Sequence, residues 1–140
     1  MAGEKNFENR LKAWLESEGI YPLGHPFDKM PVPPCGYYEK RWGGGRYVKS
    51  GLPDMRIVVN GFALEVELKG PDGTPSELQK RNIQQINRSG GIGLILYATG
   101  FETFKSIVKG VKQCLLDVPI AALKVGTVAL TNTDCTILTE

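Results

Sequence analysis

Two carboxylates and a lysine stand at the ends of two neighbouring β-rich segments. Asp54 directly precedes the segment 55–59, and Glu67 and Lys69 lie near the end of the segment 62–70, where apolar and charged residues alternate. Because alternate residues of a strand point to opposite faces of a sheet, Glu67 and Lys69 share one face. Carboxylate oxygens are the ligands that Mg²⁺ prefers in proteins, so this face is a candidate metal site.

The turn between these segments predicts which residues face each other. An Asn-Gly dipeptide at positions 60 and 61 favours a hairpin with a two-residue type I′ turn. That turn sets Arg56 against Glu65, an ordinary cross-strand ion pair, and sets Asp54 against Glu67. Two opposed carboxylates, about 5 Å apart between Cβ atoms, repel each other. Either one of them stays protonated or a cation lies between them. For any one of these charges alone, a solvated sheet face is the ordinary interpretation. The opposite face is apolar and carries Met55, Ile57, Val59, Phe62, Leu64 and Val66.

Helices are predicted on both sides of this hairpin. Apolar residues at helical spacing predict one over residues 6–18, with Asn6 as its cap. A second helix is predicted over residues 74–88, with Thr74 as N-cap and Glu77 completing a capping box.

Each of these helices carries a polar residue on its inward face. Gln79 lies four and seven residues before Ile83 and Ile86. It is either a boundary amide that reaches water or an amide directed at a phosphate or a metal-bound water. Glu8 has a similar position on the first helix, where an acid that complements the helix dipole is the simpler interpretation.

The remaining pattern predicts one α/β domain over residues 1–140. A continuous apolar run at 92–98 indicates a buried strand, and residues 101–116 indicate a helix. The tail predicts two short strands around residues 131–134. The expected order is α-β-β-α-β-α followed by a C-terminal hairpin, that is, a mixed β-sheet flanked by helices.

Residues 21–50 form a proline- and glycine-rich stretch that predicts an insertion without helices or a central strand. A short hairpin of 37–42 against 46–49 is an alternative within it. Aromatic and basic residues alternate here, which suits stacking on bases and contacts to phosphates. The aromatic residues could equally pin the loop to the domain. The candidate nucleic-acid contacts are Lys40, Arg41, Trp42, Arg46, Tyr47 and Lys49.

The bulk composition excludes several classes of protein. The net charge is only +2, so any basic surface must be local. No apolar run is long enough to span a membrane, and the N-terminal residues lack the apolar segment of a signal peptide. The three cysteines, Cys35, Cys114 and Cys135, are far apart and favour reduced thiols in a cytosol. We expect neither a membrane partner nor a small-molecule organic cofactor.

Taken together, the motifs resemble the PD-(D/E)XK nuclease superfamily. The matching residues are Pro53-Asp54, then Glu67-Leu68-Lys69, then the turn and helix 70–88. The continuation "KGPDGTPSELQKRNIQQINRSGG" is similar to the VRR-NUC branch, whose stand-alone members often come from phages or prophages. The resemblance covers about residues 6–110. It implies a restriction-endonuclease-like core and hydrolysis of phosphodiester bonds in DNA with Mg²⁺ or Mn²⁺.

The resemblance also implies roles for individual residues. Lys69 would orient the attacking water and offset negative charge, and Gln79 would support the site. The implied metal ligands are the carboxylates of Asp54 and Glu67 and the backbone carbonyl of Leu68, with Glu8 as a further ligand. The implied substrates include branched, junction or flap DNA. The resemblance also suggests a homodimer in the cytosol, or in the host cytosol for a phage protein. The alternatives are a non-catalytic nucleic-acid-binding module with the same fold and a nucleotide- or protein-binding α/β domain. The sequence has no phosphate loop to favour the latter.

Overall fold

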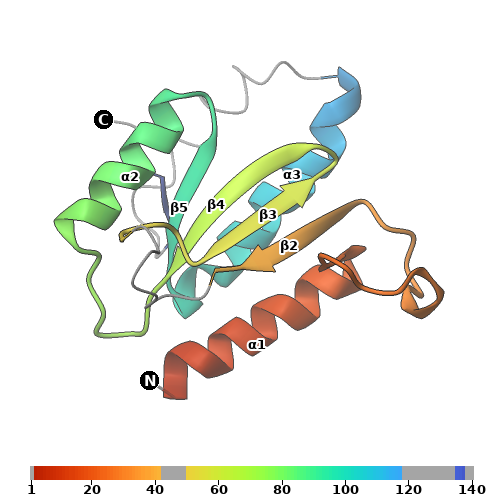
Figure 1. The fold of residues 1–140 in the computed structure, drawn as a ribbon, viewed down its shortest axis with the longest axis horizontal. Coiled ribbons are helices and arrows are strands. Elements are labelled where there is room, and N and C mark those ends of the chain that lie inside the picture. The colour runs from red at the N-terminus through yellow and green to blue at the C-terminus, as the bar shows by residue number, and fades with distance from the viewer. Residues whose placement is uncertain (1, 42–49, 118–134, 138–140) are drawn as a thin grey trace.

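The computed structural model describes residues 2–41, 50–117 and 135–137. They form an α/β fold with a mixed sheet of strand order β1-β2-β3-β4-β5-β6 (Figure 1). β1 and β2 are parallel, as are β4 and β5, and the other neighbours are antiparallel. The elements are α1 (Ala2–Ser17), β1 (Ile20–Pro22), the 3-10 helix η1 (Phe27–Lys29), β2 (Gly36–Lys40), β3 (Met55–Val59), β4 (Phe62–Leu68), α2 (Glu77–Arg88), β5 (Ile92–Leu96), the 3-10 helix η2 (Ala98–Gly100), α3 (Phe101–Asp117) and β6 (Cys135–Ile137). The predicted class, a mixed sheet flanked by helices, is confirmed.

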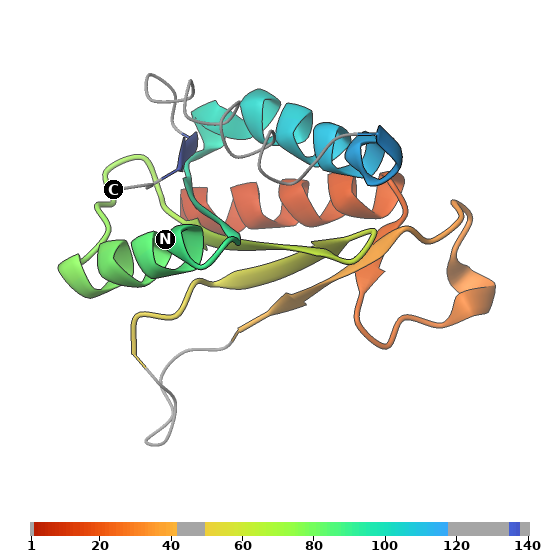
Figure 2. The same cartoon turned by 90° about the horizontal axis from the view of Figure 1, so that it is seen from above.

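Helices cover both faces of the sheet (Figure 2). α1 and α3 lie together on one face, where the rings of Phe7 and Phe101 meet edge-on with centroids 5.4 Å apart. α2 lies on the other face, and a Cβ added at Gly93 of β5 would come within 3.2 Å of Ile83. Glycine therefore lets this helix approach the sheet closely. The main core is on the α1 and α3 side and includes Leu11, Leu15, Ile57, Leu64, Val66, Leu94, Phe104 and Val108.

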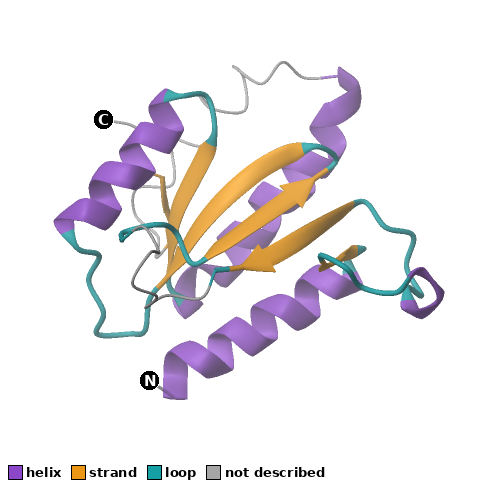
Figure 3. Ribbon diagram, viewed as in Figure 1, coloured by secondary structure: helices purple, strands orange, loops and turns teal. Residues whose placement is uncertain are grey.

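The central hairpin has the predicted register. Arg56 pairs with Glu65 and Met55 with Val66, which leaves Asp54 one step beyond the last pair. Asn60 and Gly61 both have positive φ angles, 50° and 86°, as a type I′ turn requires. Figure 3 shows the long strands of this hairpin at the centre of the sheet.

The stretch 21–50 is not only an insertion, and the predicted element order is wrong there. Two strands, β1 and β2, come before the central hairpin, and β2 pairs with β3 along its whole length. The prolines lie mostly between these strands, so they do not interrupt the pairing. Gly36 is required in β2, because a Cβ there would come within 2.0 Å of the Val58 carbonyl oxygen. The alternative partner strand, residues 46–49, lies outside the described residues.

Both predicted helix starts need correction. α1 begins at Ala2, so Asn6 lies inside the helix and does not cap it. α2 begins at Glu77, its N-cap is Ser76, and Gln79 completes the capping box instead of Glu77. At the C-terminal end, β6 pairs antiparallel with β5. The first strand of the predicted terminal hairpin falls within residues 118–134, outside the described residues.

Two remaining expectations concern the cysteines and the membrane. Cys35 is a free thiol whose Sγ lies 3.2 Å from the Glu18 carbonyl oxygen. The side chains of Cys114 and Cys135 lie outside the described residues. Among the helices that the structure describes, none has the length and apolar character needed to cross a membrane.

Candidate active site

The structure brings Asp54 and Glu67 together at one edge of the central hairpin. Asp54 follows the loop before β3, and its Oδ2 accepts a hydrogen bond of 2.8 Å from the backbone nitrogen of Leu68. Glu67 lies near the end of β4 and is 3% exposed. Its Oε2 is the one buried side-chain nitrogen or oxygen atom of the described residues that has no hydrogen-bond partner. Such an atom is costly to bury, so it requires an explanation, such as a bound cation or a proton shared with Asp54.

The electrostatics of this pair agree with the repulsion expected from the sequence. Burial, and then the neighbouring carboxylate of Asp54, raise the pKa of Glu67 to about 9. Lys69 acts in the opposite direction and Glu4 adds to the rise. Of the two ways to relieve the repulsion, the protein without a cation therefore adopts protonation of Glu67. A bound divalent cation would displace that proton, because metal ligands must be deprotonated.

Gln79 holds Glu67 in place through a capping box. The backbone nitrogen of Gln79 donates to Ser76 Oγ at 3.1 Å, and its side-chain oxygen accepts from the Ser76 backbone nitrogen at 2.8 Å. Because the cap uses the amide oxygen, the amide nitrogen is left to donate to Glu67 Oε1, at 3.1 Å. The inward position of Gln79 is as predicted, and the structure shows its partner to be a carboxylate.

Lys69 lies at the end of the same strand. Its backbone nitrogen donates to the Leu96 carbonyl, which continues the pairing of β4 and β5 by one residue. Its side chain passes close to Gly73, where an added Cβ would lie 3.4 Å from Lys69 Cδ. The ammonium group makes no ion pair with any residue in the described ranges, so it is available to a ligand.

Glu65, two residues before Glu67 on the same face, is fully neutralised. Arg41 donates to it from both terminal guanidinium nitrogens, at 2.6 and 3.2 Å, and Arg56 donates to it from Nε at 2.6 Å. Arg41 also donates to the Pro53 carbonyl at 2.9 Å, and its backbone nitrogen donates to the Asp54 carbonyl at 2.7 Å. Arg41 therefore anchors the backbone that carries Asp54. Sequence reasoning missed this role, because it assigned Arg41 to contacts with nucleic acid within the 21–50 stretch.

Glu8 is also buried, but it belongs to a different cluster. Its oxygens pair with Lys5 at 2.8 Å, with Lys12 at 3.0 Å, and with Lys40. Burial alone would raise the pKa of Glu8, but hydrogen bonds from these three lysines outweigh it and lower the pKa to about 2. Because both oxygens already have cationic partners, this arrangement disfavours the metal-ligand role that the resemblance implies for Glu8.

One acidic residue near the site was not singled out by the sequence. Glu4 lies one turn before Glu8 on α1, and a Cβ added at Gly70 would be 3.8 Å from its carboxylate. The spacing of four residues was the available signal, since it places both acids on one helix face. Of the six predicted nucleic-acid contacts, Lys40 and Arg41 make the ion pairs above, and their role toward DNA stays a prediction. The other four lie outside the described residues: Trp42, Arg46, Tyr47 and Lys49.

A divalent cation would fit here with few protein ligands. Within the described ranges, no three His, Cys, Asp or Glu side chains are grouped closely enough to hold a metal ion. The carboxylates of Asp54 and Glu67 and the Leu68 carbonyl would thus leave most positions to water and substrate. Mg²⁺ is commonly bound in this way, by one or two carboxylates together with phosphate oxygens and waters. The orphaned oxygen of Glu67 fits such an ion. No protein-family model and no curated protein matches this chain, so its chemistry has to be inferred from this geometry.

Proposed function

We propose that this protein is a divalent-metal-dependent DNA endonuclease with a restriction-endonuclease-like core. The observation that carries the proposal is the buried Oε2 of Glu67, which has no partner among the described residues and lies beside the carboxylate of Asp54. A solvated charged face would not bury a carboxylate to 3% exposure and leave one oxygen unpaired.

The chain supplies the ligands and their support. Asp54, Glu67 and the backbone carbonyl of Leu68 would hold Mg²⁺ or Mn²⁺. When bound, the ion supplies an activated water and neutralises charge on the phosphate. Asp54 is oriented by the Leu68 amide and Glu67 by the Gln79 amide, so both carboxylates are fixed before any ligand arrives. Fixed ligands reduce the reorganisation needed during the reaction.

Lys69 has a separate role in this proposal. Its ammonium group makes no ion pair within the described part of the chain, and its positive charge acts to lower the pKa of Glu67. It can therefore hold the attacking water in line and stabilise the negative charge that develops on the phosphate oxygens. A neutral residue at this position would retain metal binding but lose that stabilisation.

The test uses supercoiled plasmid and synthetic four-way junction and flap DNA. Wild-type protein should cut at least one of them with Mg²⁺ or Mn²⁺ and none with chelator. Glu67→Ala and Lys69→Ala should abolish cutting while circular dichroism shows a folded protein. The matched controls Glu102→Ala and Lys109→Ala change exposed residues of α3 and should cut normally.

Two results would contradict the proposal. Binding of DNA with no cutting of any substrate would instead support the non-catalytic nucleic-acid-binding module. Equal cutting by Glu67→Ala and wild type would show that Glu67 is not part of the active site.

A further inference from the structure

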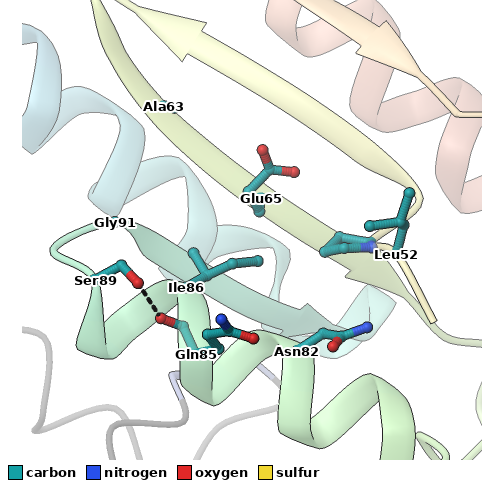
Figure 4. A pocket seen from close by; sticks show the side chains of 9 residues that line it. Leu52, Ala63, Glu65, Asn82, Gln85, Ile86, Ser89 and Gly91 are labelled. Carbon is teal, nitrogen blue, oxygen red and sulfur yellow. Dashed lines mark hydrogen bonds between the residues drawn. The ribbon is translucent and has the colours of Figure 1, made fainter. Parts of the chain in front are cut away.

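A pocket of about 390 Å³ lies beside the candidate active site (Figure 4). It opens between α2 and the early part of β4, and the loop before β3 forms one rim. Two of its lining residues connect it to that site: Pro53 is next to Asp54, and Glu65 is two residues before Glu67. The pocket volume is within the usual range for small-ligand sites, about 300–1,000 Å³.

The walls combine apolar surfaces with unused amide groups. Leu52, Pro53 and Ile86 provide apolar contact. Asn82 donates to the Gly51 carbonyl at 2.7 Å, which leaves its amide oxygen available. The side chain of Gln85 is exposed and makes no hydrogen bond within the part of the chain that the structure describes. Apolar walls with a few amides at the edge suit a heterocycle with donors and acceptors on its rim.

Glu65 is the charged residue among those that line the pocket. Its negative charge is offset by ion pairs with Arg41 and Arg56, each at 2.6 Å, although neither arginine lines the pocket. The Arg56 side chain is 47% exposed. Because its acid is paired in this way, the pocket does not repel a ligand attached to a phosphate chain.

The distance from the pocket residue Glu65 to the proposed metal ligand Glu67 is similar to the spacing of neighbouring nucleotides in a DNA strand. Residues two apart in a strand are about 7 Å apart, so Glu65 lies that far from Glu67. A nucleotide next to the phosphate at Glu67 can therefore reach the pocket with its base. A base within a paired duplex cannot do so, because its edge is hydrogen-bonded and its faces are stacked.

We propose that this pocket binds one unpaired nucleobase of the DNA strand, next to the phosphate held at Asp54 and Glu67. The proposal rests on the nuclease function proposed above. The base stacks against Leu52, Pro53 and Ile86, and the amides of Asn82 and Gln85 contact its edge. Contact with apolar side chains tolerates any base, so the pocket selects DNA with an unpaired nucleotide over any particular sequence. It gives this enzyme a preference for flaps, gaps and branches.

The test measures binding with Ca²⁺ in place of Mg²⁺. The probes are two otherwise identical DNA duplexes, one of which carries a single unpaired 2-aminopurine and the other the same base paired. Wild-type protein should bind the unpaired probe about tenfold more tightly, the order expected for removing part of one base from water against apolar side chains. The fluorescence of 2-aminopurine should change on binding.

Matched variants separate the pocket from the rest of the sheet. Ala63 is exposed and lines the pocket, and Ala63→Phe fills it. Val58 is its cross-strand partner on the same face but does not line the pocket, so Val58→Phe is the control. Ala63→Phe should lose the tenfold preference and Val58→Phe should keep it. Gln85→Ala should weaken the preference, whereas Gln113→Ala, an exposed amide on α3, should not.

The outcomes keep the pocket and the nuclease proposal distinguishable. The pocket proposal is refuted if wild type binds the two probes with equal affinity. It is also refuted if Ala63→Phe and Val58→Phe lose the preference for the unpaired probe to the same extent. Hydrolysis of bis(4-nitrophenyl) phosphate, a phosphodiester without a base, should be unchanged in Ala63→Phe, and a parallel loss of it also overturns the pocket. A wild type that binds the unpaired probe preferentially but hydrolyses no phosphodiester would support the pocket and refute the nuclease.

Discussion

Replacing Glu67 by glutamine should stabilise the metal-free protein at alkaline pH, although it removes a proposed metal ligand. Burial and the carboxylate of Asp54 raise the pKa of Glu67 from its ordinary value of 4.5 to about 9. Between these two values the folded protein keeps a proton that the unfolded chain has released. The raised pKa of this acid therefore makes the free energy of unfolding fall as pH rises from 4.5 to about 9. Glutamine is neutral at every pH and removes this dependence.

The size of the effect follows from the pKa difference. Each pH unit between the two pKa values changes the free energy of unfolding by about 1.4 kcal/mol, so the span from pH 5 to pH 8 amounts to about 4 kcal/mol at most. For a chain of 140 residues, each kcal/mol shifts the melting temperature by about 3 °C. The glutamine oxygen can still accept from Gln79, and its nitrogen can donate toward Asp54. Glu67→Gln should thus match wild type at pH 5 and melt up to about 12 °C higher at pH 8.

Calorimetric melting in the presence of chelator, at intervals from pH 5 to pH 8, measures this directly. Glu77→Gln is the control, because Glu77 is exposed on α2 and its side chain pairs with Lys80 at 3.1 Å. Saturating Mg²⁺ at pH 8 should then raise the melting temperature of wild type and leave that of Glu67→Gln unchanged. A difference between the two proteins that does not vary with pH would refute the reasoning, since Glu67 would then titrate as an ordinary carboxyl.

Four further outcomes are expected. Arg41→Ala should destabilise the protein by about 2 kcal/mol, the usual loss for hydrogen bonds to a charged group, and should lower cutting, as measured by denaturant melts and plasmid nicking. Gln79→Ala should lower both stability and cutting, whereas Ser76→Ala should lose only about 1 kcal/mol of capping energy in the same melts and still cut. Glu8→Gln should destabilise the fold and leave the affinity for Mn²⁺ unchanged in calorimetric titrations, and a weakened affinity would restore Glu8 as a ligand. Binding of Mn²⁺ at pH 7 should release about one proton, which titrations in buffers of different ionisation enthalpy will detect.

The parts of the site that could be predicted from the sequence are those that depend on local rules. Alternation with period two and an Asn-Gly turn determine the register of the hairpin, and that register brings Asp54 to Glu67. The same rules could not reveal Arg41, because it reaches Glu65 across 24 positions of sequence from the end of a strand between proline- and glycine-rich segments. The proline- and glycine-rich composition does not predict a strand here, and the strand is recognised from its pairing with β3 in the structure.

The start of α2 shows a different limit. Thr74 with Glu77, and Ser76 with Gln79, are both acceptable capping boxes by residue type, and local propensity does not choose between them. The second one is used, and it leaves the Gln79 amide nitrogen pointing at Glu67. The buried carboxylate thus adds a tertiary hydrogen bond to one of two otherwise similar caps. Sequence reasoning placed Gln79 on the correct helix face but missed that its cap and its contact to the site are one arrangement.

The strongest argument for chemistry at this edge is the contrast between Glu65 and Glu67. They are the same residue type, two positions apart on the same face of β4, and both are buried, at 7% and 3% exposure. Within the part of the chain that the structure describes, Glu65 receives three hydrogen bonds from two arginines, whereas Glu67 receives one from a neutral amide and faces another carboxylate. The fold can therefore neutralise a buried glutamate on this strand, as it does for Glu65, two residues before Glu67. As a carboxylate, Glu67 would leave Oε2 without a partner among the described residues, and an unsatisfied buried polar group costs about 1–3 kcal/mol. The metal-free protein avoids that state by keeping the Glu67 proton, which can be donated to the Asp54 carboxylate in a hydrogen bond. A cation between Asp54 and Glu67 would take the place of that proton, which ties the occupancy of the site to pH.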